Sequence, residues 1–240
     1  MPQFDLTCDT MTGSLLLEHP ERLPRGLQDR LVQFLGQAQD IGCARPSALL
    51  VPPPATHQER AEQECLRVAG YIHNSLVEGP GRRSSVLLSG CDLACHGCWV
   101  PQLHPLEAGT VVAVDRLAEA VLDPAYARDG VSILGGEPLL QLGGSRALVR
   151  ALRARGCGHI VLYSGRTYQE LCRRAQTQPA IRDVLDDVDV LIDGPYVAAR
   201  APSAGAWTGS GNQRVIDLVA TRRTGRVVLL APPRSADGAP

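Results

Sequence analysis

The chain has 240 residues, of which 44% are hydrophobic and 20% charged, so disorder of the whole chain is excluded and one large domain, with or without an appendage, is expected. Its formal net charge is −1, which lacks the basic surplus of a general nucleic-acid binder. All 24 basic residues are Arg, and this excludes enzymes that need a Schiff-base lysine or a P-loop lysine.

Residues 1–64 differ from the rest of the chain. Residues 25–39 place Leu27, Leu31, Phe34 and Leu35 on one helical stripe, and three consecutive prolines follow at 52–54. We interpret residues 1–64 as an N-terminal extension with a Pro-rich linker, to which the sequence assigns no role. The main domain is predicted over 65–233, with a flexible tail over 234–240.

The start of the chain, MPQFDLTCDT, has neither the basic cluster nor the apolar core of a signal peptide. No apolar run approaches the ~18 residues of a membrane span. We therefore expect a cytoplasmic protein with no membrane or nucleic-acid partner. In such a compartment thiols stay reduced, so clustered cysteines favour metal or catalytic roles over disulfides.

Beyond the linker, short runs rich in Val, Ile and Leu alternate with amphipathic segments. This alternation predicts an α/β fold with a parallel sheet, in which ligands gather at the carboxyl ends of the strands. Ser145 is expected to cap one helix, while Thr167 and Glu170 have capping-box spacing in another. The predicted strands cover 84–90, 131–135, 159–165, 187–193, 213–218 and 226–231, and the predicted helices 113–123, 145–156 and 167–176.

Three cysteines follow the first predicted strand, in CDLACHGC at 91–98. The spacing of Cys91, Cys95 and Cys98 lets one loop wrap three thiolates around one metal centre, whereas a closed structural site needs four protein ligands. An open coordination position is typical of a catalytic centre. Two interpretations remain: zinc with His104, or less plausibly His96, as fourth ligand, and a [4Fe–4S] cluster with one iron free.

The CxxxCxxC pattern resembles that of the radical S-adenosylmethionine (SAM) superfamily, and so does GGEP at 135–138, after the second predicted strand. The match is closest to the activating proteins of glycyl-radical enzymes, especially those of anaerobic ribonucleoside-triphosphate reductase and pyruvate formate-lyase. It departs from them at Val100, often Asn there, and at Leu134, usually Ser. The segments that carry this resemblance are SLVEGPGRRSSVLLSGC (75–91), DGVSILGGEPLLQ (129–141), DVLIDGPYV (189–197) and WTGSGNQRVIDL (207–218).

The resemblance implies a partial (β/α)6 TIM-like barrel and one [4Fe–4S] cluster held by Cys91, Cys95 and Cys98. Reductive cleavage of SAM there would give methionine and a 5′-deoxyadenosyl radical. Glu137 would pair with the SAM ammonium, because a carboxylate and an ammonium form a charge-assisted hydrogen bond. The other cofactor-binding residues that the resemblance implies are Gly97, Trp99, Gly135, Gly136, Ser164 and Asp193; Asn212, Gln213 and Arg214 receive no role.

The resulting hypothesis is a radical SAM oxidoreductase that abstracts hydrogen from a glycine of a separate glycyl-radical enzyme. Because further closely spaced cysteine sets are missing from the sequence, the electron is expected from an external flavodoxin or ferredoxin. Two alternatives stay open: a radical SAM enzyme that modifies another peptide or a small molecule, and a zinc-binding module without catalysis.

Overall fold

The computed structural model describes residues 5–9, 14–18, 49–62 and 64–231 of the chain. It divides into two compact units, Met1–Leu50 and Val51–Pro240. The first contains an antiparallel hairpin of β1 (Asp5–Asp9) and β2 (Ser14–Glu18). The predicted helical stripe at 25–39 and the tail at 234–240 lie outside the described residues. The domain limits and the nature of the extension stay predictions.

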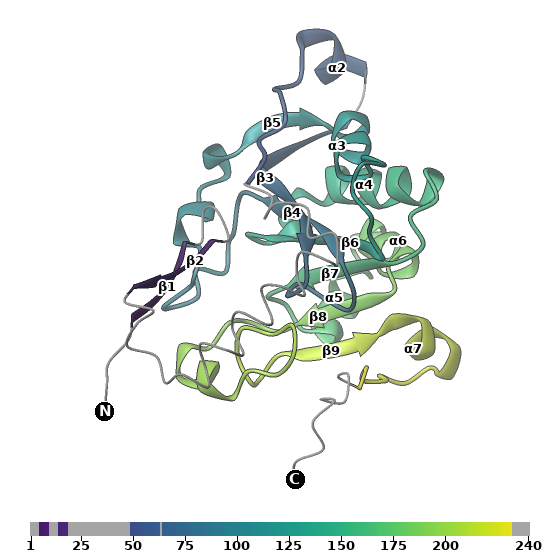
Figure 1. The fold of residues 1–240 in the computed structure, drawn as a ribbon. Coiled ribbons are helices and arrows are strands. Elements are labelled where there is room, and N and C mark those ends of the chain that lie inside the picture. Colours follow the sequence, from purple (N-terminus) through teal and green to yellow (C-terminus); the bar gives the residue numbers. More distant parts are fainter. Residues whose placement is uncertain (1–4, 10–13, 19–48, 63, 232–240) are drawn as a thin grey trace. The chain divides into compact units, whose positions relative to one another are not determined.

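A mixed seven-stranded sheet organises the second unit, in the order β5-β3-β4-β6-β7-β8-β9 (Figure 1). The four central strands, β4, β6, β7 and β8, run parallel, whereas the flanking strands pair antiparallel. The α/β prediction is confirmed, and the specific partial barrel stays a prediction. The strands are β3 (Cys65–Ser75), β4 (Arg83–Leu88), β5 (Thr110–Ala113), β6 (Gly130–Gly135), β7 (Ile160–Ser164), β8 (Val190–Asp193) and β9 (Arg214–Asp217).

Helices α3, α4 and α6 lie side by side along one face of this sheet (Figure 1). Inward-facing strand residues such as Leu88, Ile133 and Leu162 pack with them into the main core. The opposite face carries a second apolar cluster around Val161 and Ile192. Separate cores on the two faces fit parallel strands that are covered on both sides. The helices are α2 (His57–Glu62), α3 (Val114–Val121), α4 (Leu142–Ala154), α5 (Tyr168–Arg174), α6 (Pro179–Asp187) and α7 (Leu218–Thr224).

The predicted strands over 84–90, 131–135, 159–165 and 187–193 correspond to the four parallel strands. The fifth, 213–218, forms β9 but runs antiparallel to β8. The strand prediction for 226–231 is wrong, because there only an isolated bridge joins Leu229 to Ile216. No helix in the described ranges is both long and apolar enough to cross a membrane.

The capping prediction for Ser145 is also wrong. Helix α4 begins at Leu142, and Ser145 lies buried within it, where its hydroxyl donates to the Pro138 carbonyl at 2.6 Å. The short 3-10 turn η4 (Pro138–Gln141) leads directly into α4, so the chain turns helical earlier than its polar pattern suggests. In α5 the prediction is confirmed, since the Thr167 hydroxyl accepts from the Glu170 N–H.

Candidate functional site

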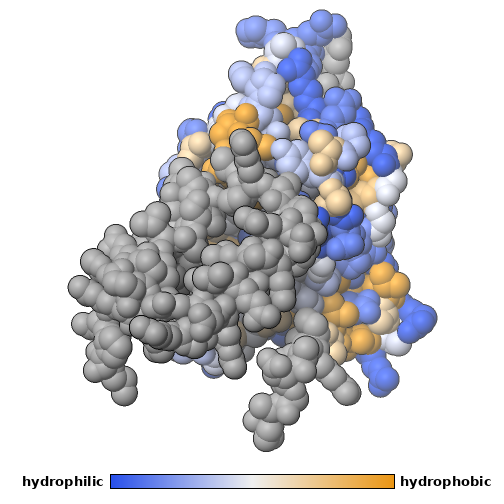
Figure 2. Space-filling view, in the orientation of Figure 1, coloured by the Kyte–Doolittle hydropathy of each residue, from blue (hydrophilic) through white to orange (hydrophobic). Residues whose placement is uncertain are grey.

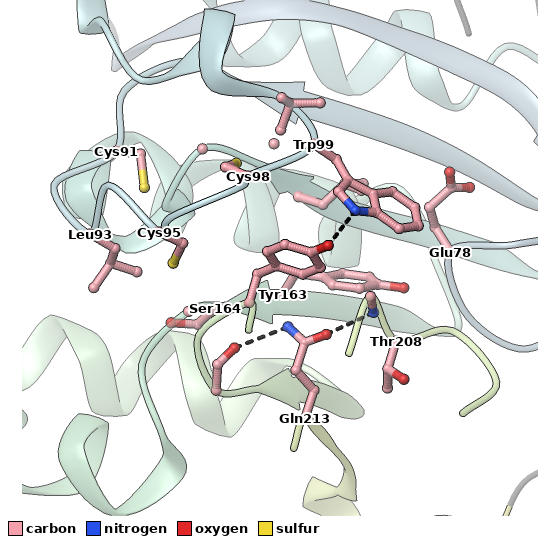
Figure 3. A pocket seen from close by; sticks show the side chains of 18 of the residues that line it. Glu78, Cys91, Leu93, Cys95, Cys98, Trp99, Tyr163, Ser164, Thr208 and Gln213 are labelled. Atoms are coloured by element: carbon pink, nitrogen blue, oxygen red, sulfur yellow. Dashed lines mark hydrogen bonds between the residues drawn. The ribbon is translucent and has the colours of Figure 1, made fainter. Parts of the chain in front are cut away.

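A cavity of about 450 Å³ opens at the carboxyl ends of the parallel strands (Figure 3). Its volume lies in the range of small-molecule sites, and its position is the one that parallel sheets use for ligands. The turns after β4, β6, β7 and β8 all contribute to its wall. Residues that line it include Glu78, Cys91, Leu93, Cys95, Cys98, Trp99, His104, Gly135, Gly136, Tyr163, Ser164, Tyr196, Trp207 and Gln213.

The cysteine loop, residues 91–98, brings the three clustered cysteines to this one cavity. Its ends are fixed by backbone hydrogen bonds, from the Cys91 N–H to the His104 carbonyl at 2.9 Å and from the Cys98 N–H to the Cys95 carbonyl at 3.1 Å. Between them Ala94 (φ 44°) and Gly97 (φ 73°) adopt left-handed backbone, which lets so short a loop reverse. One loop thus brings the three thiols to the same cavity, and their role around one metal centre stays a prediction.

The donor set fits an iron–sulfur centre by its chemistry, because three soft thiols that face one cavity are the ligands such a cluster takes. Burial raises the pKa of the Cys91 thiol, although the N–H groups of Leu93 and Ala94 bind its sulfur. Among the described residues no three His, Cys, Asp or Glu side chains are already placed to hold a metal ion together. The ligand assignment therefore stays a prediction.

The two histidines considered as zinc ligands differ in position. His96 is exposed, whereas His104 lines the cavity. The buried Nε2 of His104 has no hydrogen-bond partner within the described part of the chain. His104 and the three thiols thus line the same cavity, and metal analysis has to distinguish zinc from iron.

The glycines of the GGEP segment form the wall next to the cysteine loop. Gly135 has a φ of 116°, open to glycine and strained for other residues, and both Gly135 and Gly136 line the cavity. The turn is fixed to the end of β4, since the Gly136 N–H donates to the Leu88 carbonyl at 2.8 Å. Backbone without side chains therefore lines the cavity at this turn.

Glu137 is buried directly behind this wall, outside the residues that line the cavity. Its carboxylate accepts from the Ser164 hydroxyl at 3.0 Å, the Gly165 N–H at 2.9 Å and the Leu139 N–H at 3.0 Å. Burial raises the pKa of the Glu137 carboxyl, and these donors oppose that effect. In the structure Glu137 joins the turns after β6 and β7, and its predicted pairing with a ligand ammonium stays a prediction.

The remaining predicted site residues are divided. Ser164 and Trp99 line the cavity, whereas Gly97 and Asp193 do not. Asp193 is buried, and it accepts from the Tyr168 N–H at 2.6 Å and from the Arg214 guanidinium. These bonds give Asp193 a structural role at the start of α5.

Two aromatic residues that line the cavity, Trp99 and Tyr196, contact each other. The Trp99 indole N–H donates to the Tyr196 hydroxyl at 2.7 Å, and the two rings meet edge to face at 5.9 Å. Trp99 is nevertheless 71% exposed, so it stands at the mouth. Tyr163 lies deeper, and its hydroxyl donates to the Trp207 carbonyl at 2.9 Å. Burial raises the pKa of Tyr163.

No role was predicted for several residues that line the cavity, among them Glu78, Tyr163, Tyr196, Trp207 and Gln213. Gln213 holds the wall together, because its amide accepts from the Gly209 N–H at 2.7 Å and donates to the Gly194 carbonyl at 3.0 Å. These residues could have been proposed from their positions in the sequence, because each lies in or beside a motif next to a predicted strand.

Comparison with known proteins agrees with this geometry. The family model of the 4Fe-4S single cluster domain matches residues 77–216. The anaerobic ribonucleoside-triphosphate reductase-activating protein of Salmonella typhimurium is 33% identical over 159 residues, or 64% of this chain and 99% of the relative. That of Escherichia coli K12 is 32% identical over 154 residues, or 62% and 96%.

The chain is also similar to a protein named putative glycyl-radical enzyme activating enzyme, from Haemophilus influenzae. This shorter match is 38% identical over 84 residues and covers 34% of this chain and 32% of the relative. The family match begins at residue 77 and ends in β9, so it contains every residue that lines the cavity. The chain therefore belongs to the 4Fe-4S single cluster domain family, as a radical SAM activating protein.

Proposed function

We propose that this chain cleaves SAM reductively and thereby activates a separate glycyl-radical enzyme, of the anaerobic ribonucleoside-triphosphate reductase kind. The observation that carries the proposal is the meeting of three thiols and a glycine turn in one cavity at the strand ends. Relatives named for that activity support it, and this chain covers nearly their whole length.

In this proposal Cys91, Cys95 and Cys98 hold one [4Fe–4S] cluster, and SAM occupies the cavity beside it. When bound, the cluster supplies the electron that splits SAM into methionine and a 5′-deoxyadenosyl radical. The protein contributes binding, orientation and exclusion of water. Gly135 and Gly136 bring backbone to the cavity wall, and the turn needs glycine there because a Cβ at Gly135 or Gly136 would overlap the backbone of Leu88 or Gly90.

The other predicted contacts belong to the same proposal. Trp99, with Gly97 before it, is assigned to the adenine or ribose side of SAM, and Ser164 to a hydrogen bond with SAM. Glu137 is assigned to the ammonium of SAM, and Asp193 supports the pocket from behind. The hydrogen bonds from Ser164 and Gly165 to Glu137 support a fixed carboxylate at this wall.

Several broader expectations accompany the proposal. The four parallel strands support the partial (β/α)6 barrel of the resemblance. The domain is proposed to span 65–233, between the extension at 1–64 and the tail at 234–240. The electron donor is proposed to be a flavodoxin or ferredoxin, in a cytoplasmic setting without a nucleic-acid or membrane partner.

The test is anaerobic reconstitution of the chain with iron and sulfide, followed by dithionite and SAM. We expect brown iron–sulfide absorbance and formation of 5′-deoxyadenosine. In Cys95→Ala both are expected to be lost, because one cluster ligand is missing. Cys172→Ala is the matched control: Cys172 is a free thiol on α5, outside the cavity, so colour and product should persist.

Two outcomes would redirect the proposal. A colourless protein with one zinc ion and no sulfide would identify a zinc module, with His104 or, less plausibly, His96 as the predicted fourth ligand. Cleavage of SAM without a glycyl signal in electron paramagnetic resonance, after mixing with the partner reductase, would indicate a radical SAM enzyme for another target.

A further inference from the structure

We propose that Arg166 is a positioning residue for the cysteine loop, and that the turn Ser164–Arg166 after β7 is the dock on which this loop rests. The inference rests on the proposed function only in treating the loop as the cluster's ligand loop. It concerns how the thiols are held, and it adds residues outside the predicted site.

The first contact is an ion pair between the loops that follow β4 and β7, two strands that β6 separates in the sheet. The Arg166 guanidinium donates to the carboxylate of Asp92, which directly follows Cys91. The Arg166 side chain is 14% exposed, so this pair is partly shielded from water, unlike an ordinary surface pair. Its other terminal nitrogen donates to Glu170 on α5 at 2.8 Å, which fixes the guanidinium to a helix.

The second contact is steric. Leu93 packs so closely over Gly165 that a Cβ at Gly165 would overlap the Leu93 side chain. The Gly165 N–H is at the same time bound to Glu137, and the Arg166 N–H donates to the Ser164 hydroxyl at 3.1 Å. The dock is therefore a rigid turn, held by hydrogen bonds on its other side.

These contacts hold the part of the cysteine loop that lies between its two hydrogen-bonded ends. The backbone bonds described above fix the two ends of the loop, and Asp92 and Leu93 lie between them. The next residue, Ala94, has a left-handed backbone, which costs free energy for a residue with a Cβ. Docking of Asp92 and Leu93 offsets that cost and keeps Cys91 and Cys95 turned to the cavity, as a preorganised ligand site requires.

The test measures, in the full metal-free chain, the rate at which iodoacetamide alkylates each cysteine, read by peptide mass spectrometry. Arg166→Gln and Asp92→Asn each remove one partner of the pair. We expect both to speed alkylation of Cys95 by about two- to fivefold, the range that a partly exposed ion pair imposes on a loop equilibrium. The double variant should be no faster than either single variant, because the two residues act through one contact.

A purely electrostatic role predicts a different pattern. Loss of the Arg166 charge would slow alkylation by disfavouring nearby thiolates, while loss of the Asp92 charge would speed it. Opposite signs, or additive effects in the double variant, would overturn the proposal. Arg166→Lys keeps the charge and should restore most of the slow rate. Arg155→Gln breaks an ion pair with Asp115 away from the cavity, and should leave Cys95 alkylation unchanged.

The steric contact gives an independent test. Gly165→Ala should speed Cys95 alkylation, and Leu93→Ala in the same chain should reverse part of that effect by making room for the new methyl group. No reversal would overturn the steric half of the dock. Circular dichroism checks folding, and if Arg166→Gln does not fold, Asp92→Asn, at a 44% exposed side chain, decides the ion pair.

A last measurement follows the loss of iron from the protein reconstituted with iron and sulfide. In the reconstituted chain the same variants should lose iron to a chelator faster than the parent, as bleaching of the absorbance. Because alkylation is measured without cluster, SAM or partner, failure of the dock and failure of the proposed function give different results.

Discussion

At the scale of single residues, Gly136 is the point where the two turns that build the cavity touch. Its N–H donates to Leu88, and the next N–H, of Glu137, donates to the Gly90 carbonyl at 2.8 Å. Gly90 immediately precedes Cys91, so the glycine turn and the start of the cysteine loop are held together by backbone. A Cβ at Gly136 would overlap the Gly90 carbonyl.

We therefore expect Gly136→Ala to lower the free energy of unfolding by about 1–3 kcal/mol, the usual cost of overpacking. The obstacle is backbone, which moves less easily than the end of a side chain. Urea unfolding measures the change, with Gly158→Ala as matched control because its added methyl meets nothing within 4 Å. Equal stability of the two variants would contradict this account of the turn.

The sequence allowed the residues with local spacing to be predicted. Cys91, Cys95 and Cys98 reach one cavity because a short loop joins them, and Gly135 ends a strand that was predicted from its apolar run. Tyr196 and Gln213 could not be placed in this way. Both depend on the long segment after β8, whose path is set by hydrogen bonds between distant residues such as Trp99 and Tyr196.

At the scale of elements, the four buried parallel strands and the edge strand β9 were predictable from the sequence, whereas β3 and β5 were not. The central strands are continuous apolar runs, whereas β3 (CLRVAGYIHNS) mixes polar residues with Gly and is bent by irregular register against β4. Strand β5 has four residues and runs directly into α3, so its pattern merges with that of the helix. The apolar run 226–231 suggested a strand, but its backbone pairing with β9 is limited to a bridge.

His73, a polar residue of β3, makes the stability of the fold depend on pH. The ring of His73 is buried, stacks on Tyr126 at 3.9 Å and lies with its Nδ1 2.8 Å from the Ser84 hydroxyl. Burial, together with the nearby Arg128 charge, lowers the pKa of His73. The folded state thus holds the neutral ring, while the unfolded chain takes up a proton below a pH of about 6.5.

We expect the free energy of unfolding to be fully retained above that pH and to decrease as the pH falls below it. His73→Asn should cost roughly 1–3 kcal/mol at pH 7.5 through lost packing, and should flatten the decrease. In the variant the free energy of unfolding should still decrease somewhat as the pH falls, because burial also lowers the pKa of His159. Urea midpoints between pH 5 and 8 give the comparison, and parallel curves for both proteins would refute the role of His73.

At the scale of the whole molecule, the family match at 77–216 lies entirely within the second compact unit. This unit has its own core and the complete cavity, so it contains what the proposed cluster chemistry needs. Its first residues are part of that fold: the Ala55 N–H donates to the Val111 carbonyl of β5 at 2.7 Å, and Glu59 forms an ion pair with Arg116 of α3.

Two truncated chains separate these contributions. A chain that starts at residue 51 should fold, take up the iron–sulfur cluster and cleave SAM within about twofold of the full chain, because it keeps every contact named here for the second compact unit. A chain that starts at residue 65, the domain start expected from the sequence, loses the contacts of Ala55 and Glu59 with β5 and α3. It should unfold at lower urea, by about 1–3 kcal/mol, as expected when several native contacts are lost together. Equal stability of the two chains would place the functional start at 65, and loss of the cluster in the longer one would show that residues 1–50 take part in the site.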